Sequence, residues 1–153
     1  MLGRFVAGLL AVMVIVLLPL KLTGISEARR NENALEYALC LFYDGVSTRG
    51  KVTEKDFSEL INMISFSGIN CYVEIEMGTI IYGKEQSVIE VSYTDELIGM
   101  IESSGDEGLD LKNRILTVRA VQNRENLSMR LANMFWDSFR PETVVTVGGY
   151  IHG

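Results

Sequence analysis

Very few side chains in this sequence are suited to chemistry. Its 153 residues include one histidine, His152, and two cysteines, Cys40 and Cys71. A structural zinc ion needs about four cysteine or histidine ligands, so this set is too small for such a site. His152 follows a glycine pair at the end of the sequence. A mobile imidazole there is a poor general base, because catalysis needs fixed geometry.

Two groups of carboxylates are the remaining candidates for chemistry. Asp106, Glu107 and Asp110 lie in the stretch SSGDEGLD, where their oxygens could bind a calcium ion. Their spacing is not that of an EF-hand loop, so a solvated acidic loop is the favoured interpretation. Glu74 and Glu76 share one face of a predicted strand, which is typical of solvated residues.

Recognisable catalytic motifs are also missing from the sequence. It contains no Gly-rich phosphate loop, no Gly-x-Ser-x-Gly motif and no His-Glu-x-x-His motif. We therefore expect a protein that is not an enzyme, with no catalytic residue, no metal and no cofactor.

The two cysteines allow two interpretations. If the head of the protein is outside the cell, a disulfide between Cys40 and Cys71 would tie a long helix to a sheet. Alternatively they are two buried thiols, since cysteine is among the most buried residue types.

Charge argues against a nucleic-acid partner. The chain has 14 Lys and Arg against 20 Asp and Glu, a net charge of −6, and its acidic excess lies after residue 30. A nucleic-acid groove needs clustered positive charge. The length beyond the apolar start allows one domain with a modest core.

The chain opens with MLGRFVAGLLAVMVIVLLPLKL, in which residues 5–20 carry no charge. A helix from Phe5 to Ile25 would be about 30 Å long, the thickness of the bilayer hydrocarbon. Two other interpretations are a secretory signal cut near Ser26-Glu27-Ala28 and a pilin-type leader cut after Gly3, with the apolar helix retained.

Some features of this segment suggest that it packs against other helices. Small residues allow close approach of helices in a membrane, and a proline near the end of the run predicts a kink or local unwinding. Membrane helices also tolerate glycine and proline without such a role. The candidate assembly residues are Phe5, Ala7, Gly8, Ala11, Val14 and Pro19.

The helical pattern continues beyond the apolar run. Ala34, Ala38 and Leu41, with Tyr37, predict one face of a helix that runs from residue 4 to about residue 44. Its end is expected at residues 44–45 or 49–50, where glycine follows. We therefore divide the chain into an apolar helix (1–24), an amphipathic extension (25–50) and a head domain (51–153).

The head is predicted to be an α+β domain with an antiparallel-rich sheet of about four strands and about three helices. Thr53 and Asp56 predict a capping box at the start of the first helix, and Thr94 is the predicted N-cap of the second. The third helix is predicted over 124–139. Strands are expected over 71–77, 87–93, 114–123 and 142–153, with 114–123 central and the last broken by a bulge or bend at Gly148-Gly149.

The apolar start, GKVTEKDFSELINMISFSGINCYVEIE, LDLKNRILTVRAVQN and TVGGYIHG together resemble a group of small, anchored, pilin-like proteins. These are TadE-like pseudopilins, encoded with Tad-type (type IVc) secretion and pilus machinery in Gram-positive, clostridia-like bacteria. The resemblance implies that the N-terminal helix assembles with like helices or anchors a minor subunit, with the head outside the cell. Gly8 stands where most type IV pilins carry glutamate, which favours a pseudopilin or minor pilin.

Two functions from different classes follow. One is a pilin-like or pseudopilin subunit of a surface filament or Tad-type apparatus, with copies of itself, other pilin-like subunits and the membrane as partners. The other is a single-span, membrane-anchored binding module or secreted domain that does not polymerise. The expected location is the cell membrane with an extracytoplasmic head, or a cell-surface filament. Lys21, Arg29 and Arg30 favour the opposite orientation, so the outward head rests on the resemblance.

Overall fold

One continuous helix, α1 (Leu2–Arg49, 48 residues), runs from the apolar start into the head. The structure is a computed structural model and describes residues 2–82, 87–122 and 143–152. Of the two predicted ends, the helix uses the second, where Gly50 takes a positive φ of 65°. The Gly50 amide donates to the Val46 carbonyl at 2.8 Å and closes the last turn.

Four antiparallel strands form the main sheet, in the order β3-β2-β5-β6. They are β2 (Tyr72–Tyr82), β3 (Ser87–Ser92), β5 (Arg114–Gln122) and β6 (Thr143–Ile151). The predicted α+β class with a four-stranded antiparallel sheet is confirmed, and β5 is an interior strand as expected. A second sheet pairs two short strands, β1 (Lys51–Val52) with β4 (Leu109–Asp110). Two-residue strands carry no periodicity, so the sequence did not reveal it.

The head contains two described α-helices, α2 (Glu54–Phe66) and α3 (Thr94–Ser104), and a 3₁₀ turn, η1 (Gly105–Glu107). The predicted capping box at Thr53 and Asp56 is present. The helix predicted over 124–139 lies outside the described residues.

Thr94 is not an N-cap, contrary to the prediction. The N-cap of α3 is Tyr93, and Thr94 is the first helical residue. The Thr94 hydroxyl accepts from the Ile75 amide at 2.8 Å and donates to the Ile75 carbonyl at 3.2 Å. It therefore fastens α3 to β2.

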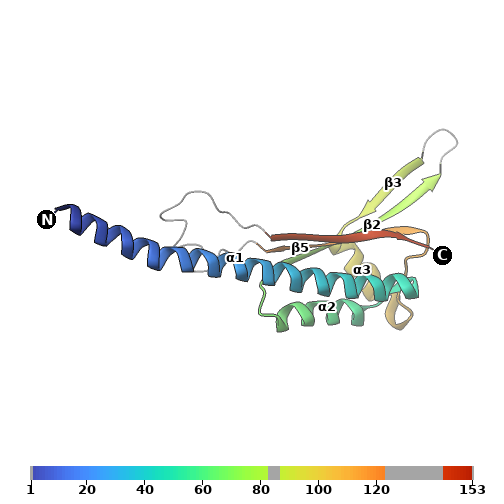
Figure 1. Cartoon of the computed structure of the whole chain (residues 1–153). Helices are drawn as coiled ribbons and strands as arrows, with labels where there is room; N and C mark the ends of the chain where they lie inside the picture. The colour runs from blue at the N-terminus through green and yellow to red at the C-terminus, as the bar shows by residue number, and fades with distance from the viewer. Residues whose placement is uncertain (1, 83–86, 123–142, 153) are drawn as a thin grey trace.

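The helices cover one face of the main sheet and leave the other face open (Figure 1). The covered face buries alternate residues of β2, β5 and β6, and these join the helices in one core: Ile75, Met77, Leu116, Val118, Ala120, Val145 and Ile151. The residues between them point to the open face, where Tyr72 is 63% exposed.

Gly148 and Gly149 form neither a bulge nor a bend, which corrects the prediction. β6 pairs with β5 residue for residue, Thr117 opposite Gly148 and Leu116 opposite Gly149. The glycines permit close approach instead. A Cβ atom at Gly148 would lie 2.6 Å from the Leu116 carbonyl oxygen, and one at Gly149 would lie 2.7 Å from the Tyr43 hydroxyl.

The predicted buried face of α1 is also wrong in part. Tyr37 and Leu41 are exposed, at 69% and 49%. The buried stripe is Leu35, Ala38, Leu39, Phe42 and Val46. Both stripes have helical spacing in the sequence, so periodicity did not distinguish them.

Candidate assembly helix

The first half of α1 is an apolar helix that projects from the head (Figure 1). None of its apolar stretch is buried by the described part of the chain. Phe5 and Val14 are 73% and 56% exposed. Because this segment is long and apolar enough to cross a bilayer, it is compatible with a membrane anchor.

Small residues follow one side of this segment. Gly3, Ala7 and Ala11 are spaced four apart, so they lie along one side of the helix with Gly8 nearby. A Cβ atom added at Gly8 would meet no described atom within 4 Å. The helix therefore has a narrow strip on which another helix can approach closely.

Pro19 does not interrupt the helix, so the predicted local unwinding is not found. The proline has no N–H to donate to the carbonyl four residues earlier. In the following turn, the Thr23 hydroxyl donates to the Pro19 carbonyl at 2.8 Å. The apolar segment thus continues directly into the second half of α1.

The second half of α1 is fixed within the head along its length. Near its start, the Asn31 side-chain amide donates to the Gln122 side-chain oxygen at the end of β5, at 3.5 Å. Further on, Leu35, Leu39 and Val46 are fully buried. This half packs against β6, β5 and α2, so the apolar half continues directly from a helix that belongs to the core.

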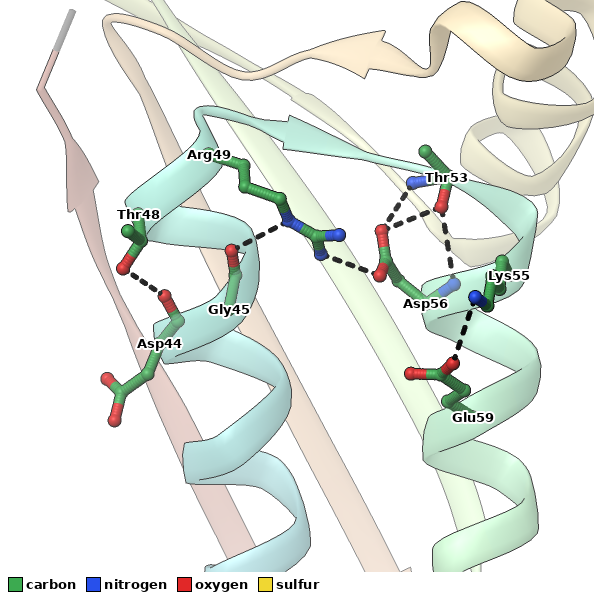
Figure 2. A network of polar contacts seen from close by, with 8 residues as sticks. All are labelled: Asp44, Gly45, Thr48, Arg49, Thr53, Lys55, Asp56 and Glu59. Atoms are coloured by element: carbon green, nitrogen blue, oxygen red, sulfur yellow. Dashed lines mark hydrogen bonds and ion pairs between the residues drawn. The ribbon is translucent and has the colours of Figure 1, made fainter.

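A polar network joins the end of α1 to the start of α2, and Figure 2 shows it. Arg49 donates to the Asp56 carboxylate at 2.6 Å and to the Gly45 carbonyl at 3.1 Å. The same carboxylate accepts from the Thr53 amide at 2.9 Å and from its hydroxyl at 2.8 Å. Asp56 thereby caps one helix and holds the end of the other.

The Asp56 carboxyl is stabilised in its charged form. Burial by itself raises its pKa, but hydrogen bonds from Arg49 and Thr53 and the positive charge of Arg49 outweigh burial. The net result is a pKa below the ordinary 3.8. The sequence identified this residue only as a capping partner, and no sequence signal connected it to Arg49.

Cys40 and Cys71 are separate, half-buried thiols in the structure. Burial raises the pKa of the Cys71 thiol, so it stays protonated at neutral pH. Cys71 also lines a shallow cleft of about 410 Å³ between the end of α2 and the start of β2. Polar and apolar surface contribute about equally to the rest of its lining, which comes from Ile61, Ile64, Ser65, Gly68, Ile69, Asn70 and Val73.

The remaining candidate residues are dispersed. Asp106 and Glu107 are exposed in η1, and Asp110 accepts from the Lys112 amide at 3.0 Å. Within the described ranges, no three Asp, Glu, His or Cys side chains are grouped as a metal site requires. The exposed His152 ring packs edge-on against Tyr150, with centroids 5.0 Å apart.

The two strand glutamates have different surroundings. Glu74 pairs with Arg119 across the strands at 3.6 Å, whereas Glu76 is exposed opposite Thr117.

None of the family models, curated protein sequences or solved structures compared with this chain matches it. The function must therefore be argued from the arrangement of α1 and the head.

Proposed function

We propose that this protein is a pilin-like or pseudopilin subunit that assembles with copies of itself or with similar subunits through residues 4–24. Its head stands outside the membrane, on a Tad-type apparatus or a surface filament. The observation that carries the proposal is the continuity of α1. The first half of this helix is apolar and exposed, and its second half packs in the core of the head.

Rigid continuity suits assembly better than simple anchoring. An anchor requires only hydrophobicity, and a flexible connection to the head would serve it equally well. A subunit packed by its helix must transmit the position of that helix to its head. Leu35, Leu39 and the Arg49–Asp56 pair provide such a connection.

Small side chains on the apolar half support helix packing in the same way. In lipid, helices associate through close contact rather than through the hydrophobic effect. Gly3, Ala7 and Ala11 supply a strip for such contact, whereas an anchor surrounded only by lipid gains nothing from small residues.

A single-span binding module is the competing function, and the cleft at Ile64, Ile69 and Cys71 is the observation that favours it. In that case the helix only anchors, and the cleft binds a ligand. The two functions make different predictions about the helix surface, so they can be separated by substitution there. We also propose that the protein is not an enzyme.

The test enlarges the side chains of the strip while keeping the helix apolar. Ala7→Leu with Ala11→Leu should lower the fraction of full-length chain recovered in oligomers from membranes or surface appendages by about tenfold. The control, Met13→Leu with Val16→Leu, changes the opposite side of the helix and should leave that fraction unchanged. Equal recovery for both variants would contradict the assembly function.

Amino-terminal sequencing of the mature protein supplies an independent test. A start at Arg4 would indicate a prepilin-type peptidase and support the proposal. A start at Arg29 would remove the helix and overturn it.

A further inference from the structure

Both edges of the main sheet are open to pairing in the described part of the chain. Among the described strands, β3 pairs only with β2, and β6 pairs only with β5. Natural edge strands are usually protected by lysine, proline or a bulge. Residues 143–151 contain no charged residue, lysine or proline, and residues 87–92 contain one charge, Glu90.

The two edges run in opposite directions. The sheet has four strands, and each is antiparallel to its neighbour. Consequently β3 and β6 are antiparallel to each other. Across the sheet, Val91 of β3 lies at the level of Tyr150 near the end of β6. A second copy in the same orientation, shifted along the strands, therefore presents its β3 to the first copy's β6 in the correct direction for an antiparallel ladder.

Pairing of β3 with β6 leaves the α1 helices of neighbouring copies pointing in the same direction. β6 runs alongside α1 (Figure 1). Joining β3 to β6 therefore keeps the α1 helices of both copies pointing the same way, as a shared membrane or filament requires. Two β3 strands pairing with each other would turn one helix to point in the opposite direction. In a β-barrel, all strands are tilted by the same angle to the barrel axis. A sheet joined from several copies can curve in the same way and surround their assembled α1 helices.

Side chains on the open face are compatible with this contact. Ile89 and Val91 of β3 are 55% and 40% exposed, and Val144 and Tyr150 of β6 are 40% and 38% exposed. All four side chains point to the open face of the sheet. Ile89 and Val91 lie opposite even-numbered residues of β2, which point to that face, and the even-numbered residues of β6 point to it as well. Cross-strand apolar pairs of this kind stabilise antiparallel sheets. The only charge on the two edges is Glu90, so no register opposes like charges.

We infer that the head of this protein binds a second copy of the chain by β-sheet addition, with β3 of one copy paired to β6 of the next. The contact joins two different edges of the sheet, so each copy keeps a β3 or β6 edge to which a further copy can bind. It rests on the proposed function for the shared orientation of the copies, but it uses a different surface from the apolar helix.

Disulfide cross-linking of the full-length chain in membranes tests the contact. A chain carrying Val91→Cys is co-expressed with one carrying Val144→Cys or Thr146→Cys, and the wild-type chain serves as the blank for Cys40 and Cys71. At least one of the two mixtures should give a cross-linked dimer at about tenfold the yield of either variant alone. Cross-linking of Val91→Cys to itself, without a mixed product, would overturn the inference.

A charge variant provides the second measurement. Val91→Lys is combined with Ile89→Cys in one chain, so that a lysine lies on the edge strand. This lysine should lower the cross-linking of that chain to the chain carrying the β6 cysteine about fivefold. The control Tyr72→Lys puts the same charge on the open face of β2, an interior strand, and should leave the yield unchanged. Equal yields for both lysine variants would contradict strand pairing.

Val14→Cys separates this inference from the proposed function, because it reports contact between apolar helices. If Val14→Cys cross-links and no β3–β6 pair does, helix assembly stands and the joined sheet is wrong. If the β3–β6 pair cross-links and Val14→Cys does not, the joined sheet stands and helix assembly is wrong.

Discussion

At the scale of single residues, Asp56 is the most consequential polar group in the described structure. Its buried carboxylate accepts hydrogen bonds from Arg49 and Thr53. We expect Asp56→Asn to lower the free energy of unfolding by about 1–3 kcal/mol, since a charged hydrogen bond is lost and Arg49 loses its partner. Glu59→Gln is the control, because it breaks only the exposed Lys55–Glu59 pair at 3.8 Å and should cost less than about 0.5 kcal/mol. Urea denaturation of the full chain in detergent measures both variants.

The same carboxyl makes stability depend on pH. Its pKa is lower in the folded protein than in the unfolded chain. The stabilisation is therefore complete above the unfolded pKa and is lost as pH falls through the folded pKa. Below about pH 4, the wild-type protein should lose stability more steeply than Asp56→Asn. Parallel pH profiles for the two proteins would contradict this assignment.

Gly148 and Gly149 predict a second set of residue-scale effects. Gly148→Ala should destabilise the fold by about 1–3 kcal/mol, because its Cβ atom would collide with backbone atoms of β5. Gly149→Ala should lower the stability less, because its Cβ atom would come too close only to the Tyr43 side chain, mainly its hydroxyl. Removing that hydroxyl by Tyr43→Phe should partly restore the stability of the Gly149→Ala protein. Gly99→Ala, whose Cβ atom meets nothing within 4 Å in α3, should be neutral or stabilising. Thermal unfolding followed by circular dichroism compares these variants, and failure of the Tyr43→Phe rescue would argue against the contact.

At the scale of elements, α1 has two different sides within the head. Leu39 is fully buried and Leu41 is 49% exposed, although both are leucines in one helix. Leu39→Ala should lower the free energy of unfolding by about 2–5 kcal/mol, and Leu41→Ala by less than about 1 kcal/mol. Chemical denaturation of the two variants checks the orientation of the helix. Similar losses would mean that the helix is rotated.

The sequence predicted those elements that carry their own local signals. The Thr53–Asp56 capping box and the glycine at position 50 define helix ends through bonds made within a few residues. The alternation around Ile75 likewise reflects burial on one face, and the apolar run around Val118 predicted an interior strand. These signals need no knowledge of distant parts of the chain.

What the sequence missed depends on contacts between distant segments. Nothing near Gly149 shows that Tyr43 approaches it, and nothing near Thr94 shows that Ile75 accepts its hydroxyl. The pairing of β1 with β4 is similarly remote. For the candidate assembly helix, the small residues and the apolar length were visible in the sequence, but its rigid connection through Asn31 and Asp56 was not.

At the scale of the whole molecule, the protein combines an apolar rod with an acidic head. The positive charges Arg4, Lys21, Arg29 and Arg30 lie at or near the ends of the apolar run, and the acidic excess follows residue 30. Heads of like charge repel each other over about 8–10 Å at physiological salt. Assembly through the helices should therefore strengthen as salt is raised, and oligomer size measured by light scattering in detergent checks this. A decrease with salt would contradict it.

The central claim is that the apolar half of α1 packs against copies of itself. The most direct measurement replaces residues 5–20 with leucines and compares energy transfer between labelled full-length chains in lipid vesicles. The polyleucine helix still spans the bilayer but lacks Ala7 and Ala11 of the strip and the neighbouring Gly8. We predict that this variant remains in the membrane while its energy transfer falls to the level of unassociated chains. Transfer equal to that of the wild-type protein would contradict the claim and leave the helix as an anchor only.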